Sequence, residues 1–199
     1  MTRTEQGKDK QRTLDSPSLQ RMEGDGNERK FILSFSSEEP YERWFGIEIL
    51  DHSEQAVDLA RINQIGCLLF NHDRDAVIGK ILRAWIENGR GMAEVEFDAD
   101  EKSEIIYQKV RSGTLKGVSV GYHIDLLEEV QAGKTSTDGR FSGPCEIARK
   151  WWPFEISIVS VPADATVGVG REVEHMKELP TSVYESQLQI NKNITGGNL

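Results

Sequence analysis

A G-x-S-x-G string at residues 117–121 is the stretch of the chain that most directly suggests chemistry. A serine hydroxyl is a weak nucleophile until a neighbouring base activates it. In α/β-hydrolases the string forms a sharp turn between a strand and a helix, whereas elsewhere it is an ordinary strand with an incidental serine. On a strand, Ser119 shares a face with Gly117 and Gly121, and the missing side chains leave room for a substrate backbone. We therefore take the two glycines as candidate positions of a substrate groove.

Four histidines are available as the base that such a serine needs. His72 follows the apolar run "LLFN" and precedes a polar turn, which predicts a strand end where a side chain can face a cleft. His52 lies in a polar turn, His123 lies four residues along the strand of Ser119, and His175 lies in a charged C-terminal segment. We prefer His72, and the alternative is a turn histidine that is hydrogen-bonded to a neighbouring aspartate.

The third group of a triad orients the imidazole and stabilises its charged form. In "WPFEISIVSVP" the alternation of a strand places Glu155 and Ser157 on one face and the bulky apolar residues on the other. A carboxylate in an apolar strand is rarely buried without a partner, so a histidine across the sheet would explain Glu155. A solvent-facing glutamate on an amphipathic strand is the alternative.

The surrounding sequence predicts a mainly β protein with flanking helices. Short apolar or alternating runs fill residues 31–35, 44–50 and 66–72, and residues 76–98 read as two strands joined by a turn at Asn88-Gly89. We expect a short helix over 56–62 and a clear helix over 100–113, with Asp100 as its cap. The helix ends just before the strand of Ser119.

Composition narrows the classes of partner. A net charge of −9 and a pI near 5.0 argue against a nucleic-acid surface. No stretch reaches the roughly 18 apolar residues that cross a bilayer, so we expect no membrane contact. The two cysteines, Cys67 and Cys145, form no C-x-x-C pair and predict free thiols in a reducing cytoplasm.

Differences in composition along the chain predict one domain with two tails. Residues 1–29 are polar and charged, so we expect a disordered N-terminal tail, and residues 171–199 are expected to be a flexible C-terminal tail. Residues 30–170 would form the domain that carries the site.

Three ordered motifs carry a resemblance: "LLFNHDRDAVIGKI", then "VRSGTLKGVSVGY", then "FEISIVSVPADATVGV". Together, over about residues 40–170, they resemble the prohead (procapsid maturation) serine proteases of tailed bacteriophages, which are related to the herpesvirus assemblins. The resemblance implies a triad of His72, Ser119 and Glu155 in a small β-barrel surrounded by helices. It also implies an endopeptidase that cuts scaffold and capsid-protein segments, and itself, inside the procapsid in the host cytoplasm.

Other functions remain open at this stage. An α/β-hydrolase would use Ser119, Asp164 and His175 in that order, and a non-catalytic β-barrel virion or scaffold-associated protein would use the serine strand only as structure. Residues His72, Asp73, Asp75 and His123 lack the spacing of a metal site, so we expect neither metal nor other cofactor. The partners that we expect are the major capsid protein or scaffold protein as substrate and the protease itself, with a homodimer as a candidate assembly.

Overall fold

The computed structural model describes residues 2–3, 9–14, 19–22, 24 and 26–161. In this part, eleven strands form one sheet and two short helices lie beside it. The first strands are β1 (Thr2–Arg3), β2 (Asp9–Leu14), β3 (Leu19–Arg21), β4 (Lys30–Ser37), β5 (Tyr41–Arg43) and β6 (Gly46–Leu50). After α1 (Ala60–Ile65) come β7 (Cys67–Phe70), β8 (Asp73–Glu87) and β9 (Arg90–Phe97), and after α2 (Glu101–Arg111) come β10 (Gly117–Val130) and β11 (Cys145–Val159). The mainly β prediction is therefore confirmed.

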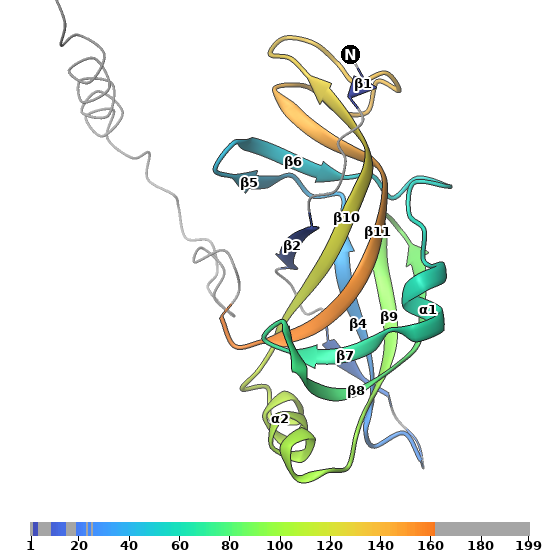
Figure 1. The fold of residues 1–199 in the computed structure, drawn as a ribbon, viewed down its shortest axis with the longest axis vertical. Coiled ribbons are helices and arrows are strands. Elements are labelled where there is room, and N and C mark those ends of the chain that lie inside the picture. The colour runs from blue at the N-terminus through green and yellow to red at the C-terminus, as the bar shows by residue number, and fades with distance from the viewer. Residues whose placement is uncertain (1, 4–8, 15–18, 23, 25, 162–199) are drawn as a thin grey trace, which may run out of the picture. The chain divides into compact units, whose positions relative to one another are not determined.

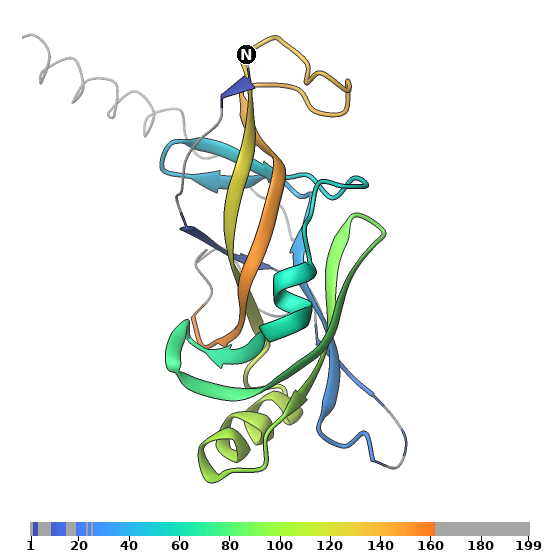
Figure 2. The same cartoon turned by 45° about the vertical axis from the view of Figure 1, so that its right-hand side comes forward.

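The long antiparallel pair β10–β11 runs through the middle of the sheet (Figure 1). The hydrogen-bonded order is β1-β10-β11-β7-β8-β9-β4-β3, with β2 on β10 and the β5–β6 hairpin on β11. Strand β11 is parallel to β6 near its start and to β7 near its end, so its second edge is shared by two strands. Figure 2, turned from the first view, shows β7 and β8 folding under the end of β11.

Alternation along β10 explains why this pair is the centre of the fold. Val118, Val120 and Tyr122 are fully buried, and Ile156 and Ile158 of β11 pack in the same cluster. Burying such side chains contributes about 1.5–3 kcal/mol each. The apolar face of the pair therefore anchors the strands, and Ser119 lies on the opposite face.

The local signals for turns and caps act as predicted. Asn88 and Gly89 both have positive φ and join β8 to β9 in a two-residue hairpin. The side chain of Asp100 accepts hydrogen bonds from the amides of Lys102 and Ser103 and so caps α2. Among the described residues, no helix is long and apolar enough to cross a bilayer.

The short helix begins later than expected. We predicted residues 56–62, but α1 spans Ala60–Ile65. The preceding residues pair with β11 instead, because the Trp151 amide donates to the Ala56 carbonyl and the Asp58 amide donates to the Trp151 carbonyl, both at 3.0 Å. Extended pairing along β11 therefore takes the first half of the predicted helix.

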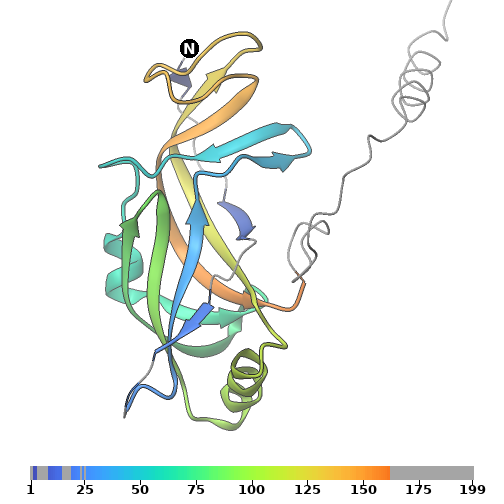
Figure 3. The same cartoon turned by 180° about the vertical axis from the view of Figure 1, so that it is seen from behind.

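The expected barrel surrounded by helices is corrected by the structure. The strand order is open from β1 to β3, and the described part of the chain has two helices flanking the sheet. Closure would require a ladder between β10 and β4, but β2 pairs with β10 and β3 pairs with β4 instead. Figure 3 shows the two short strands from behind.

The predicted N-terminal tail contains these short strands. Strands β1, β2 and β3 all lie within residues 1–29, and they pair through their backbones with β10 or β4. The C-terminal segment 171–199 lies outside the described residues, and the domain boundaries stay a prediction.

Candidate active site

The register of β10 against β11 places two of the candidate residues close together. Ser119 lies opposite Ser157, and Gly121 lies opposite Glu155, across an antiparallel ladder. Cross-strand neighbours on one face have Cβ atoms about 4.5–5.5 Å apart. Ser119, Ser157 and Glu155 therefore gather on the face opposite the apolar core.

Ser119 lies inside a strand. It is the third residue of the 14-residue strand β10, which has antiparallel partners on both sides. The strand-to-helix turn of an α/β-hydrolase is absent here, so that alternative is wrong for this site. Asp164 and His175, which that alternative required, lie outside the described residues.

His72 reaches the serine from a tight turn between β7 and β8. Phe70 pairs with Asp73, so Asn71 and His72 form a two-residue hairpin loop, with φ of 53° and 60°. Asparagine tolerates this left-handed backbone better than most residues. The prediction that His72 lies at a strand end is confirmed.

Hydrogen bonds tie this turn to β11 and to Ser160, the residue that follows it. The Asn71 amide donates to the Ile158 carbonyl at 2.9 Å, and the side-chain oxygen of Asn71 accepts from the Ser160 amide at 2.8 Å. The His72 amide donates to Ser157 Oγ at 3.3 Å. The backbone that carries the imidazole is therefore held in place by hydrogen bonds.

The three candidate side chains form one continuous chain of hydrogen bonds. His72 Nε2 lies 2.8 Å from Ser119 Oγ, and His72 Nδ1 contacts Glu155 Oε1. The serine is 1% exposed, the histidine side chain 19% and the glutamate side chain 7%. The three side chains have the same connectivity as the nucleophile, base and orienting carboxylate of a serine-protease triad.

The two glycines of the string make room for β11. A Cβ on Gly121 would lie 2.5 Å from Glu155 Cγ, and one on Gly117 would lie 2.8 Å from the Val159 carbonyl oxygen. The Glu155 side chain thus lies over Gly121, and the β11 backbone lies close to Gly117. Contact between a substrate and the main chain of these glycines stays a prediction.

A pocket of about 390 Å³ lies on the β7 side of Glu155. It is lined by Arg61, Ile65, Gly66, Cys67, Leu69, Arg74, Trp152, Phe154 and Glu155. Burial raises the pKa of the Cys67 thiol, and the charge of Glu155 raises it further. The thiol is therefore a poor nucleophile at neutral pH.

The other histidines have different partners. His52 Nε2 lies 2.7 Å from Ser36 Oγ, but its Nδ1 lies 2.9 Å from the Leu50 carbonyl oxygen rather than a carboxylate. His123 stacks on Trp152, with ring centroids 5.1 Å apart. The described residues contain no group of three or more potential metal ligands, and both ring nitrogens of His72 already have partners.

Sequence reasoning missed the second serine–histidine pair and the anchoring of the His72 turn. Ser36 and His52 lie in unrelated segments, and nothing in their spacing indicates a contact. Asn71 directly before His72 was a usable signal, because asparagine at a strand end favours a left-handed turn.

Comparison with known proteins now decides the family. The model for the caudovirus prohead serine proteases matches residues 45–179, a range that contains His72, Ser119 and Glu155. The chain belongs to this family. Prohead serine proteases take part in phage capsid maturation, so the predicted resemblance is confirmed.

One curated relative of this prohead protease carries a different description. The chain is 38% identical over 169 residues to a protein described as the major capsid protein of Halomonas phage phiHAP-1. The alignment covers 82% of this chain and 26% of the relative, so the chain spans about a quarter of the relative's length. No solved structure matches the chain.

Proposed function

We propose that the chain is a serine endopeptidase in which Ser119 is the nucleophile, His72 the general base and Glu155 the orienting carboxylate. The observation that carries the proposal is the unbroken series of contacts from Ser119 Oγ through both ring nitrogens of His72 to Glu155. Membership of the prohead protease family supports the same reaction class.

The geometry supports a two-step acyl transfer. Ser119 Oγ attacks the scissile carbonyl carbon while His72 Nε2 takes the hydroxyl proton, and the tetrahedral intermediate then expels the amine with that proton. A water molecule then attacks the acyl-enzyme in the same way, with His72 again taking the proton, and the acyl group leaves the restored serine. Glu155 accepts from Nδ1–H throughout, so the imidazole keeps the tautomer that presents Nε2 to the serine.

The burial of Glu155 strengthens its effect on the base. Its side chain is 7% exposed, and a charge interacts more strongly in a poorly solvated site than in water. The imidazolium that forms during attack is therefore stabilised next to a carboxylate that water screens little.

The substrates that we propose are segments of the major capsid or scaffold protein, cut inside the procapsid in the host cytoplasm. The role of the family in capsid maturation supports this choice, and so does the capsid-protein description of the relative. A second copy of the chain is proposed as a further substrate, because a protease confined with its own copies meets them at high local concentration.

Labelling with a fluorophosphonate probe tests the nucleophile. The probe should modify Ser119, as mapped by peptide mass spectrometry, and Ser119→Ala should abolish labelling. Ser36→Ala is the matched control, because Ser36 is also buried and also contacts a histidine. Labelling that survives in Ser119→Ala would refute the proposed nucleophile.

Cleavage of the capsid protein tests the substrate. Purified wild-type chain should shorten the phage capsid protein, whereas Ser119→Ala should leave its intact mass unchanged. Intact masses of the two chains after identical expression test self-processing, which we place in residues 1–29 and 171–199 on either side of the proposed protease domain 30–170. Identical termini in wild type and Ser119→Ala would rule self-processing out.

A further inference from the structure

Strand β2 occupies the open edge of the serine strand. One edge of β10 pairs with β11 along its whole length, and the other edge pairs with β2 over residues 118–123. Thr13 lies directly opposite Ser119, and Gln11 lies opposite Gly121. Figures 1 and 2 both show β2 beside β10.

The sequence of β2 gives it little reason to be a permanent strand. It reads "DKQRTL", in which Asp and Lys are residue types that strands usually lack. Among the described strands, β2 has a ladder with β10 alone. The ladder between the two strands consists of backbone hydrogen bonds, which any extended peptide can make.

Apart from its ladder with β10, β2 lies near β4 without pairing with it. The described strands next to it in the sequence, β1 and β3, pair with the far part of β10 and with β4. Removing β2 would break no other described ladder, so the edge at 118–123 can be vacated while the sheet stays intact.

We propose that the edge of β10 at residues 118–123 is the docking site for extended peptide substrates, and that β2 is an intramolecular competitor for it. The inference rests on the proposed function, because it assigns substrate binding and its regulation to the same site. An incoming peptide adds to β10 as an antiparallel strand beside Ser119, and β2 must leave before it binds. The resting chain is then partly self-inhibited.

The size of the inhibition follows from occupancy. If β2 covers the edge for about 90% of the time, the apparent affinity for a peptide falls about tenfold, because only the uncovered fraction binds. A tethered segment acts at an effective concentration of about 1 mM or more, so such occupancy needs only a weak strand.

The test compares two full-length double variants. Arg12→Pro with Thr13→Pro removes a ladder donor whichever of the two amides faces β10, since facing alternates along a strand. Arg12→Ala with Thr13→Ala keeps both amides and is the matched control. The proline variant should cut the capsid protein with kcat/KM raised about tenfold over the alanine variant, whereas fluorophosphonate labelling of Ser119 should change less than twofold.

A peptide added in trans separates competition from a general change in structure. A synthetic peptide of residues 9–14 at about 1–10 mM should slow the proline variant, and a scrambled peptide should not. If the proline variant does not fold, replacing residues 9–14 by GSGSGS in the full chain serves as the second variant.

Equal or lower kcat/KM in the proline or GSGSGS variant, with labelling intact, would overturn the inference and show β2 to be a structural strand. Absence of Ser119 labelling in the wild type would instead refute the proposed function. The two failures are therefore distinguishable in one set of measurements.

Discussion

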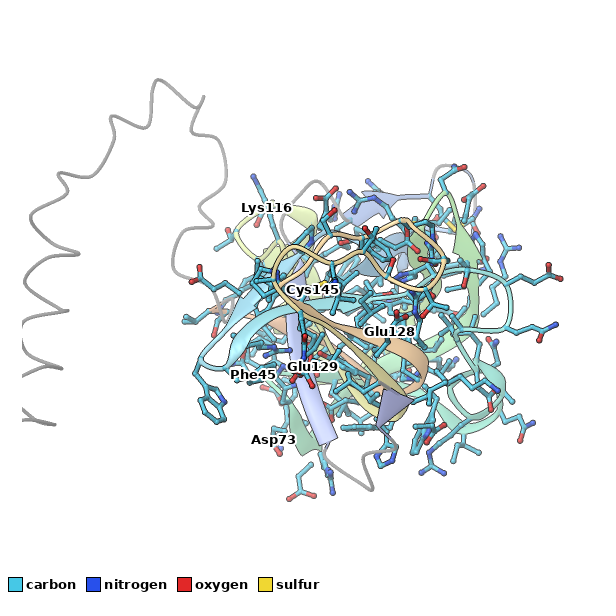
Figure 4. The ribbon with its side chains drawn as sticks, turned by 90° about the horizontal axis from the view of Figure 1, so that it is seen from above. Phe45, Asp73, Lys116, Glu128, Glu129 and Cys145 are labelled. Atoms are coloured by element: carbon cyan, nitrogen blue, oxygen red, sulfur yellow. The ribbon has the colours of Figure 1, made fainter. Side chains whose placement is uncertain are left out.

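Both ends of the β10–β11 pair hold polar side chains, but they hold them differently. At one end, Ser119 and Glu155 contact the two nitrogens of a single histidine. At the other end, beside the loop that Figure 4 views from above, Arg149 contacts Glu128, Asp51 and Asp138 at 2.6–2.8 Å. Arg140 adds contacts to Asp51 and Asp138.

The two ends differ in the kind of group that lies at the centre of each cluster. In the arginine cluster, defined as Asp51, Glu128, Asp138, Arg140 and Arg149, each group is a permanent charge opposite a permanent opposite charge. In the triad the middle group is a histidine, whose ring can donate one hydrogen bond and accept another. The same two strands thus support a cluster of ion pairs beside a loop and a hydrogen-bond chain that, in the proposed mechanism, transfers a proton.

The largest expected effect comes from breaking the triad at its first two members. Ser119→Ala or His72→Ala should each lower kcat/KM for capsid cleavage by about 10⁴- to 10⁶-fold, because triad members act as a unit. The double variant should be no worse than either single variant. Additive losses in the double variant would contradict the shared role.

Substitution of Glu155, the third member of the proposed triad, should lower the rate by a smaller factor. Glu155→Gln keeps the shape of the side chain but favours the wrong tautomer of His72, so we expect a loss on the order of 10³- to 10⁴-fold in kcat. Glu129→Gln is the control, because Glu129 is an exposed glutamate on the neighbouring strand β10, at the far end of the pair from Ser119 (Figure 4). A pH–rate profile that is unchanged in Glu155→Gln would show that the carboxylate does not act on the histidine.

Breaking the arginine cluster should affect stability and spare the chemistry. Arg149→Ala removes an arginine partner from each of the buried carboxylates Asp51 and Glu128, and we expect a loss of about 2–4 kcal/mol in the free energy of unfolding. Urea unfolding measures it, with Arg149→Lys as the variant that keeps the charge. The rate of Ser119 labelling in the folded protein should stay within twofold of wild type; a larger drop would mean that the two ends are coupled.

The smallest effect is a pH dependence of the same cluster. Hydrogen bonds from Arg149, Ser136 and Arg140 hold the pKa of the Asp138 carboxyl well below its usual range. A lowered folded-state pKa contributes stability above the unfolded pKa of about 4, and this contribution is lost as the pH falls. Asp138 is 36% exposed, so we expect Asp138→Asn to cost at most about 1 kcal/mol at pH 7 and progressively less below pH 4. The assignment would be contradicted if the difference in unfolding free energy between wild type and Asp138→Asn grew as the pH fell below 4.

The three residues of the proposed triad could be picked out from the sequence for a physical reason. Ser119 and Glu155 stand out in strands whose alternation is clear, and His72 follows an apolar run that ends in a turn. The arginine cluster could not be predicted from the sequence, because its members come from separate segments and their spacing shows no helix or strand periodicity. Strand β2 was missed since its polar composition argues against a strand, whereas its pairing is made by the backbone.

The turn that carries His72 has a consequence for how the enzyme should fail on heating. Catalytic loops commonly open at a lower free energy than the core of the domain. Here Asn71 and His72 are bonded to β11 at Ile158, Ser160 and Ser157, so the base belongs to the same cooperative unit as the central strands. Thermal inactivation and loss of β-structure should therefore follow one curve, without a preceding phase in which a folded sheet has lost its activity.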